Sequence, residues 1–403
     1  MTGTMLAQII SYLLSPIISR LYTSNDMADL GLYSRIVALI AAISTARFEL
    51  ALSLPKRNEH AFLLFKLTFK LIIYSTLLSS VILLVISFFD NKFENIWIYL
   101  LSTMSSFFVA FISLGSNWSL RNENFKSISF QRVSNSLISN FLKVIFGYLH
   151  LGSIGIILGT TFGYVFSSYK FFKDFLESKK IFYSSNSKTS SLVKTYSQFP
   201  KVSLPHVIFD MVRDLVIAFY IAEIFGKSIF GSYVYSTMML SIPISIIGQS
   251  IGQVFYQRVS KLYSESKDIF KPLIKTFLVL ILIAIIPFSI LFFQGEELFA
   301  FVFGNEWRSA GLYSEILSIW MFINFILSPI SIVLIVLNKQ KQNFYLGLWA
   351  TLCQIICIVF LPMLFNDYKT NFINVLWSLS ISQALISTIG IMFIFRYSYL
   401  VRK

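Results

Sequence analysis

The stretch FPKVSLPHVIFDMVRDLVIAFYIAEIFG, from Phe199 to Gly226, is apolar enough to cross a bilayer and yet carries charges in its middle. At about 100° per residue one helix face holds four polar side chains, namely His206, Asp210, Arg213 and Asp214. We do not expect that face to contact lipid, because ionisable side chains inside a membrane face protein or a water-filled cavity. Two interpretations stay open. Arg213 neutralises Asp210 as a structural staple, or the face borders a water-filled path.

The composition is strongly apolar and basic. Hydrophobic residues make up 56% of the 403 residues, charged residues make up 13%, and 42 residues are Phe, which no water-soluble core needs. The net charge of +14 fits the basic excess of cytoplasmic membrane loops, so it does not call for nucleic acid as a partner. Cys353 and Cys357 lie four residues apart in an apolar segment and are interpreted as small hydrophobic residues of a helix. The sequence therefore predicts a polytopic membrane protein.

Apolar windows of about 20 residues, the length that crosses a bilayer, occur twelve times along the chain. The predicted spans are 2–19, 28–52, 62–89, 96–118, 127–149, 152–173, 202–225, 229–256, 272–294, 311–337, 343–365 and 372–395. Of the 33 Lys and Arg residues, 24 lie in or beside one alternate set of loops, 5 belong to the other set, and four lie inside spans. Basic residues accumulate on the cytoplasmic side, so this split places both termini in the cytoplasm.

The polar segment from Glu177 to Gln198, rich in Ser, is predicted to be a flexible linker between two halves. We therefore expect an N-terminal six-helix bundle at 1–176, a cytoplasmic linker at 177–199 and a C-terminal six-helix bundle at 200–403.

A short internal repeat supports this division. Gly31-Leu32-Tyr33 opens the second span and Gly231-Ser232-Tyr233 opens the eighth, 200 residues later. Six spans per half place both halves the same way up, so the pseudo-symmetry axis lies along the membrane normal. Two such bundles facing each other leave a central cleft.

The second span has one side that combines small residues with charges, namely Gly31, Arg35, Ala42, Ala46 and Glu49. Helix packing accounts for the small residues but not for Arg35. Arg47 and Glu49 would point about 160° apart on a continuous helix, so we do not expect them to form a simple helical pair. For Arg47, snorkelling to the cytoplasmic surface and an anion site are equal alternatives.

Further polar residues stand in other predicted spans. Lys143 lies 16 residues into the fifth span, too deep to reach back to the cytoplasm, although the opposite interface is within its reach. Gln249 and Gln253 share a face with Tyr256 in the eighth span. Glutamines in a membrane bond to a neighbouring helix or to a polar solute, and both interpretations stay open.

The sequence lacks motifs of catalysis and cofactor binding. The three histidines, His60, His150 and His206, are far apart, and the chain has no Gly-rich phosphate loop and no HExxH sequence. We therefore predict a protein that is not an enzyme, binds no cofactor or metal and hydrolyses no ATP. The free energy for any transport must therefore come from an ion gradient or from the concentration difference of the substrate.

Three blocks of residues carry a resemblance to a known family. The first block holds Arg20-Leu21-Tyr22-Thr23 and Arg47-Phe48-Glu49-Leu50-Ala51 with Leu54-Pro55, and the second holds Phe199-Pro200, Leu204-Pro205 and Gln253-Val254-Phe255-Tyr256-Gln257-Arg258. A weaker third block is Phe303-Gly304 with Trp307, Ala310, Tyr313 and Pro329. These blocks resemble bacterial lipid-linked oligosaccharide flippases of polysaccharide biosynthesis, of the O-antigen flippase type. Their superfamily also holds multidrug and toxic-compound extrusion transporters.

The resemblance implies two six-helix bundles in a V shape around a cationic cavity, in the bacterial inner membrane. It implies an undecaprenyl-diphosphate-linked glycan as the substrate, with polysaccharide polymerase and chain-length machinery as possible partners. Relatives usually carry a short charged lead before the first span, so we expect Met1 to be an internal methionine or a shortened start.

Combining the resemblance with the residues, we expect alternating access between the bundles. The substrate-binding candidates are Arg35, Arg47, Arg213, Lys143, Gln249 and Gln253, because a diphosphate needs charge-assisted hydrogen bonds once it leaves water. The ion-coupling candidates are Asp210, Asp214 and Glu49, which would take a proton or bind sodium. Three other functions stay open: a drug exporter with an acid-lined cleft, a membrane-embedded polymerase or glycosyltransferase, and a scaffold without transport.

Overall fold

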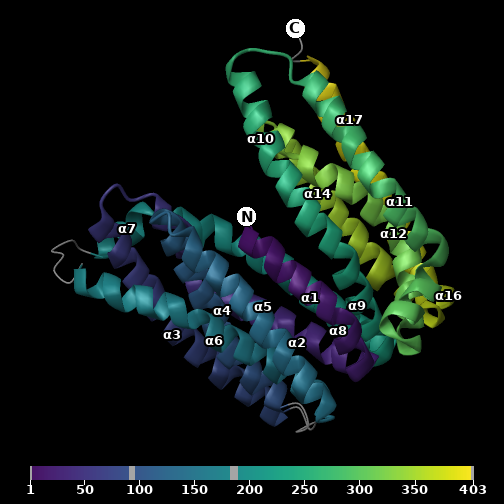
Figure 1. Ribbon diagram of the computed structural model, residues 1–403, viewed down its shortest axis with the longest axis horizontal. Coiled ribbons are helices and arrows are strands. Elements are labelled where there is room, and N and C mark those ends of the chain that lie inside the picture. Colours follow the sequence, from purple (N-terminus) through teal and green to yellow (C-terminus); the bar gives the residue numbers. More distant parts are fainter. Residues whose placement is uncertain (1, 90–95, 182–188, 401–403) are drawn as a thin grey trace. The chain divides into compact units, whose positions relative to one another are not determined.

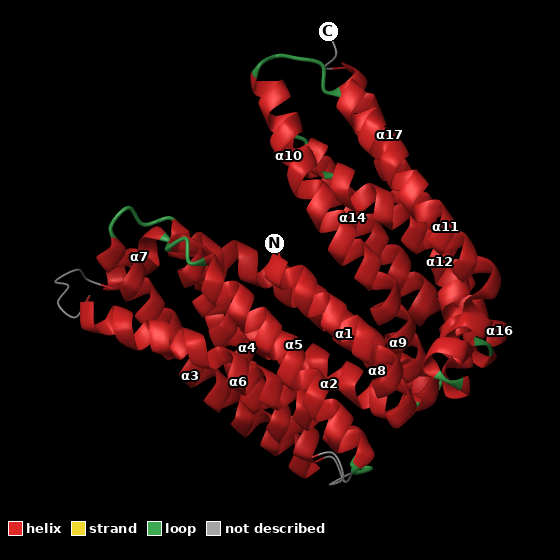
Figure 2. Ribbon diagram, viewed as in Figure 1, coloured by secondary structure: helices red, strands yellow, loops and turns green. Residues whose placement is uncertain are grey.

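We analysed a computed structural model of the chain, which describes residues 2–89, 96–181 and 189–400. Throughout these ranges the chain consists of helices and loops, without strands (Figure 2). It divides into two compact units, Met1–Phe219 and Tyr220–Lys403. The boundary falls inside a helix, and the division at residues 177–199 expected from the sequence stays a prediction.

The first unit contains the purple to blue-green helices of Figure 1. Its elements are α1 (Thr2–Leu21), α2 (Ser24–Thr45), the 3₁₀ helix η1 (Phe48–Ser53), α3 (Asn58–Phe89), α4 (Ile96–Arg121), α5 (Phe125–Tyr148), α6 (Gly152–Ile181), α7 (Thr189–Thr195), the π-helix η3 (Phe199–Ser203) and most of α8 (Leu204–Ile224).

The second unit contains the green to yellow helices, several of which continue into one another (Figure 1). Its elements are α9 (Lys227–Pro243), η4 (Ile244–Gly248), α10 (Gln249–Ser264), α11 (Phe270–Phe303), η5 (Asn305–Trp307), α12 (Arg308–Ile330), α13 (Ile332–Val336), α14 (Gln340–Ile355), η6 (Ile356–Phe360), α15 (Leu361–Leu364), α16 (Asn366–Thr370) and α17 (Phe372–Leu400).

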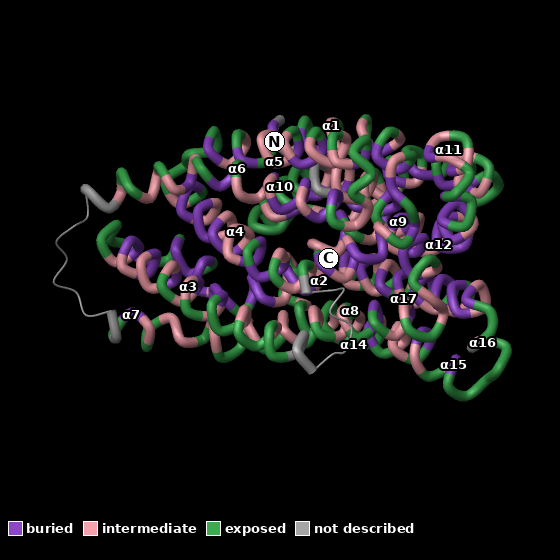
Figure 3. Tube along the Cα trace, turned by 90° about the horizontal axis from the view of Figure 1, so that it is seen from below, coloured by how far each residue is buried: buried purple, intermediate pink, exposed green. Residues whose placement is uncertain are grey.

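Each of the twelve predicted spans falls on a helical segment, so the prediction of an all-helical polytopic membrane protein is confirmed. Eight described helical segments are long and apolar enough to cross a membrane by length and composition. The four other predicted spans fall on α1, α5, α6 and α8. Buried and exposed positions alternate along the helices (Figure 3), as expected where one side packs on protein and the other faces the surroundings.

Two segments differ from the sequence predictions. The second span does not run to residue 52 as one helix, because α2 ends at Thr45 and η1 follows. Part of the predicted flexible linker is helix α7, which packs on α3 and contains the buried residue Leu192. Its apolar residues join an aromatic cluster, and this outweighs the local preference of Ser and Thr for loops. Residues 182–188 of the linker lie outside the described part of the chain.

Hydrogen bonds between buried hydroxyl groups fix α2 inside the first unit. Tyr33 Oη donates to Ser105 Oγ of α4 over 2.6 Å, and Ser105 Oγ donates to Thr161 Oγ1 of α6 over 3.0 Å. Thr161 donates in turn to the Ile157 carbonyl over 2.9 Å. Every donor in this chain has an acceptor, so the network costs little to bury and holds three helices in register.

Helix α5 is unusually polar for a membrane segment, and its neighbours explain why it is tolerated. Gly155, Gly159 and Gly163 of α6 let the two backbones approach closely, as small residues do in membrane helix pairs. From an adjoining side of α5, Asn140 Nδ2 donates to Ser11 Oγ of α1 over 2.9 Å. The polar face of α5 is therefore covered by α1 and α6.

Candidate functional site

The most unusual backbone of the first unit lies directly after α2. Ala46 and Arg47 are left-handed, with φ of 47° and 60°. A non-glycine residue in this region costs about 1–2 kcal/mol, so other contacts must hold it there. One such contact is the apolar side of η1, because Phe48 and Leu52 are buried among the aromatic side chains of α3 and α4.

The break brings Arg47 and Glu49 together. Arg47 Nη1 lies 3.4 Å from Glu49 Oε1, and the two side chains are 25% and 2% exposed. The expectation that they point apart is wrong, since it assumed one continuous helix and two left-handed residues change the chain direction. For the same reason Glu49 does not share a helix face with Arg35. Within the described residues, Arg47 Nε and Glu49 Oε2 are buried and have no hydrogen-bond partner.

The chemistry of this pair follows from its burial. A buried carboxylate requires a compensating charge, and Arg47 supplies it from a position that is partly open. A guanidinium offers five donors in a planar fork that matches phosphate oxygens. Glu49 contacts Arg47 through Nη1 alone, over a distance that is long for an ion pair, and a quarter of the Arg47 side chain is exposed, so an anion can approach the outer part of the guanidinium.

A second charged group runs along α8. His206 Nδ1 lies 3.2 Å from Asp210 Oδ2, and Arg213 Nη1 lies 3.3 Å from Asp210 Oδ1. Arg213 also donates from Nε and Nη2 to Asp214 Oδ1 over 3.0 and 2.9 Å. The i, i+3 pair suggested by the sequence is therefore present, and the pairing with Asp214 adds to it. An anion that binds Arg213 must displace a carboxylate.

The remaining candidates of the first unit lie in less charged surroundings. Arg35 Nη1 donates to the Gly31 carbonyl of its own helix over 3.0 Å. The stem of Lys143 crosses Gly159 of α6, and its carbonyl accepts a hydrogen bond from Tyr22 Oη over 2.7 Å. The described contacts include no ion pair or hydrogen bond of the Lys143 ammonium group.

The glutamine candidates belong to the second unit. Gln253 is an exposed residue of α10, whereas the side chain of Gln249 lies outside the described part. The described contacts pair neither glutamine with a charged group. Their expected role in binding stays a prediction.

Arg121 is a further residue of interest that the sequence does not single out. It ends α4, and its guanidinium binds the segment that joins η1 to α3. Its position at a helix end and beside a loop gave no hint of a partner more than 60 residues earlier.

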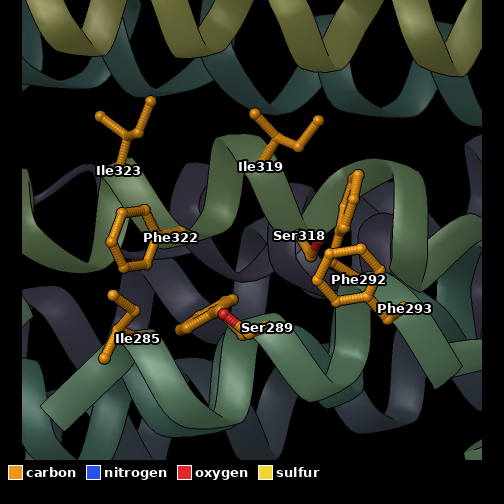
Figure 4. A pocket seen from close by; sticks show the side chains of 9 residues that line it. Ile285, Ser289, Phe292, Phe293, Ser318, Ile319, Phe322 and Ile323 are labelled. Atoms are coloured by element: carbon orange, nitrogen blue, oxygen red, sulfur yellow. The ribbon is translucent and has the colours of Figure 1, made fainter.

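The second unit contains an apolar pocket of about 380 Å³ between α11 and α12 (Figure 4). Phe288, Phe292 and Phe322 line it, and the hydroxyls of Ser289 and Ser318 are the polar groups among its lining side chains. Without a charged group, this pocket does not fit an anion.

Comparisons with known proteins agree with the fold. No curated protein sequence matches the chain. The inward-facing structure of a multidrug resistance MATE family transporter of the MOP superfamily has a TM-score of 0.70 at 14% identity, covering 98% of this chain and 95% of that one. The lipid II flippase MurJ, in an inward closed conformation, has a TM-score of 0.70 at 16% identity, covering 100% and 89%.

One comparison concerns the sequence itself. A family model described as "Polysaccharide biosynthesis protein" matches residues 17–312, which is more than half of the chain. The matched part contains Arg35, Arg47, Glu49, Lys143 and all the charges of α8. The chain therefore belongs to the polysaccharide biosynthesis protein family and has the fold of the MATE transporters and of the lipid II flippase.

Proposed function

We propose that this protein is a flippase that moves undecaprenyl-diphosphate-linked oligosaccharides across the bacterial inner membrane for the synthesis of a surface polysaccharide. Transport proceeds by alternating access of the two helical units, with both chain termini in the cytoplasm. A polysaccharide polymerase and its chain-length machinery are the partners that would consume the product. Membership in the polysaccharide biosynthesis family supports this substrate class.

The observation that carries the proposal is Arg47, which has a left-handed backbone and a guanidinium that is only partly paired with Glu49. A diphosphate that leaves water needs charge-assisted hydrogen bonds, and a guanidinium fork supplies two at once. The Arg47 side chain is partly exposed and makes one long contact to Glu49, through Nη1. Its left-handed backbone indicates that the fold holds it at a cost, as is common at functional sites.

The other cations support the same ligand. Arg35 belongs to α2, which ends shortly before Arg47, and Lys143 adds a positive charge from α5. Arg213 joins when a carboxylate of α8 is neutralised. Gln249 and Gln253 would bind sugar hydroxyls.

Ion coupling is assigned to the carboxylates. Asp210 and Asp214 share one guanidinium, so a proton or a sodium ion on either one leaves Arg213 still neutralised. Glu49 has a different part. When a diphosphate draws Arg47 away, the buried carboxylate loses its counter-charge, and this favours the uptake of a proton. Substrate binding and proton uptake are then linked at one residue.

The test compares Arg47→Ala, Arg35→Ala and a matched control, Arg132→Ala on the exposed side of α5. Losing a charged hydrogen bond of about 1.5–3 kcal/mol weakens binding more than tenfold. We expect surface glycan to disappear and lipid-linked glycan to accumulate on the cytoplasmic face in both site variants, also when expression is adjusted to give wild-type protein abundance. Arg47→Lys should rescue in part, because a point charge replaces a fork. Full glycan display by Arg47→Ala would overturn the proposal.

A drug exporter is the second candidate, favoured by the two partly exposed carboxylates of α8 and by the likeness to MATE transporters. The same variants separate the two functions. An exporter of cationic drugs should lose resistance in Asp210→Asn and keep it in Arg47→Ala, whereas the flippase should lose glycan display in Arg47→Ala.

A further inference from the structure

Arg121 reaches from the end of α4 into the segment between η1 and α3. Its Nη1 donates to the Leu52 carbonyl over 2.8 Å, and its Nη2 donates to the Pro55 carbonyl over 2.7 Å and to Asn58 Oδ1 over 3.0 Å. One guanidinium thus connects the last turn of η1 with the first residue of α3 through hydrogen bonds. These contacts lie directly after the segment that carries Arg47 and Glu49.

The acceptors of Arg121 are all neutral, and no carboxylate forms an ion pair with it within the described ranges. Its positive charge therefore lies at the carbonyl end of η1, while Glu49 lies in the first turn of the same helix. A cation at the C-terminal end and an anion at the N-terminal end both stabilise a helix dipole. The charge arrangement favours η1 in its observed place.

Apolar side chains also pack α4 against η1. Trp118, one turn before Arg121, packs in the cluster that contains Leu52 and Phe48. Helix α4 therefore contacts η1 through apolar packing and binds the end of η1 through Arg121. A short 3₁₀ helix of six residues has few hydrogen bonds of its own, so its position depends on these contacts.

We infer that Arg121 is a positioning residue that fixes η1 and thereby holds Arg47 and Glu49 in their paired geometry. Its consequence for transport rests on the proposed function, whereas its consequence for η1 does not. The contacts explain why arginine is required: lysine carries the charge but has no planar fork to bind two carbonyls and an amide side by side.

The test uses the full-length protein in lipid nanodiscs, with Arg121→Gln, Arg121→Lys and the control Arg132→Gln. Hydrogen–deuterium exchange is followed in peptides that cover residues 46–56 and, for comparison, in peptides of α2. We expect the amides of η1 to exchange at least about tenfold faster in Arg121→Gln, with an intermediate effect in Arg121→Lys. Peptides of α2 and the control variant should remain as in the wild type. Unchanged exchange at η1 would overturn the inference.

Transport provides the second readout. If Arg121 acts through the Arg47–Glu49 pair, Arg121→Gln lowers transport in the wild type but lowers it no further in a Glu49→Gln background. A merely structural role predicts additive losses, and additive losses would also overturn the inference. Normal transport in Arg47→Ala and Glu49→Gln, together with fast exchange of η1 in Arg121→Gln, would refute the proposed site while leaving the positioning role intact.

Discussion

Replacing Arg47 by Ala is the perturbation whose result separates function from architecture most clearly. The change removes the ion-pair partner of a carboxylate that is 2% exposed. Breaking a buried ion pair from one side costs about 3–5 kcal/mol, because the other charge is left uncompensated. Arg47 is 25% exposed and its 3.4 Å contact is long, so we expect a loss of about 2–3 kcal/mol in the free energy of unfolding.

Adding Glu49→Gln to Arg47→Ala removes the stranded charge. The double variant should recover most of the lost stability, because no buried ion remains. Transport should stay absent, since the donor for the diphosphate is gone. The double variant should therefore regain stability without regaining transport, a separation that a single variant cannot show.

Thermal unfolding of the purified protein in nanodiscs measures the first effect. For a unit of this size, 2–3 kcal/mol corresponds to a fall in Tm of roughly 4–12 °C. Lys261→Ala, which removes a side chain that is 76% exposed, is the control and should change Tm little. A double variant that regains transport along with stability would refute the reasoning and leave the pair a structural element.

Three further predictions concern other parts of the chain. Asp210→Asn alone should leave protein abundance nearly unchanged on an immunoblot, because Asp214 still pairs with the shared guanidinium, whereas changing both should lower abundance strongly. Gly159→Ala should lower stability by about 1–3 kcal/mol in thermal unfolding, since its methyl group would lie 2.9 Å from a backbone nitrogen of α5, while Gly347→Ala has open space and should be neutral or stabilising. A cysteine at Ser264 should be shielded from an impermeant thiol reagent in intact cells and one at Asn366 should be labelled, and the reverse pattern would contradict the orientation expected from the basic residues.

The helices could be predicted from the sequence because bilayer thickness fixes the length of an apolar span. The predicted ends are close to those of the structure for most helices, and the charged face of α8 was found from its periodicity. The i, i+3 contact of Arg213 with Asp210 needs only helix geometry, which local spacing supplies. Such features follow from neighbouring residues alone.

The break after α2 could not be predicted in this way. Ala46 and Arg47 both favour helix, and nothing in their local sequence signals a left-handed backbone. The segment that follows the break contacts residues of other helices, including Arg121 and the aromatic residues of α3 and α4. Tertiary packing outweighs the local helix propensity at this point. The direction of the Glu49 side chain depends on the break, so the prediction for Glu49 was wrong as well.

The two arginine groups differ in their balance of charge, and this difference orders their roles. The pair of Arg47 and Glu49 is neutral and the Arg47 side chain is partly exposed, so an anion can approach it without net repulsion. Arg213 lies between two carboxylates, so with His206 neutral the group on α8 carries a net negative charge. A diphosphate is repelled there until a cation or a proton neutralises one carboxylate. In a flippase for an anionic lipid, Arg47 would therefore bind the substrate first, and α8 would join only after the coupling ion has arrived.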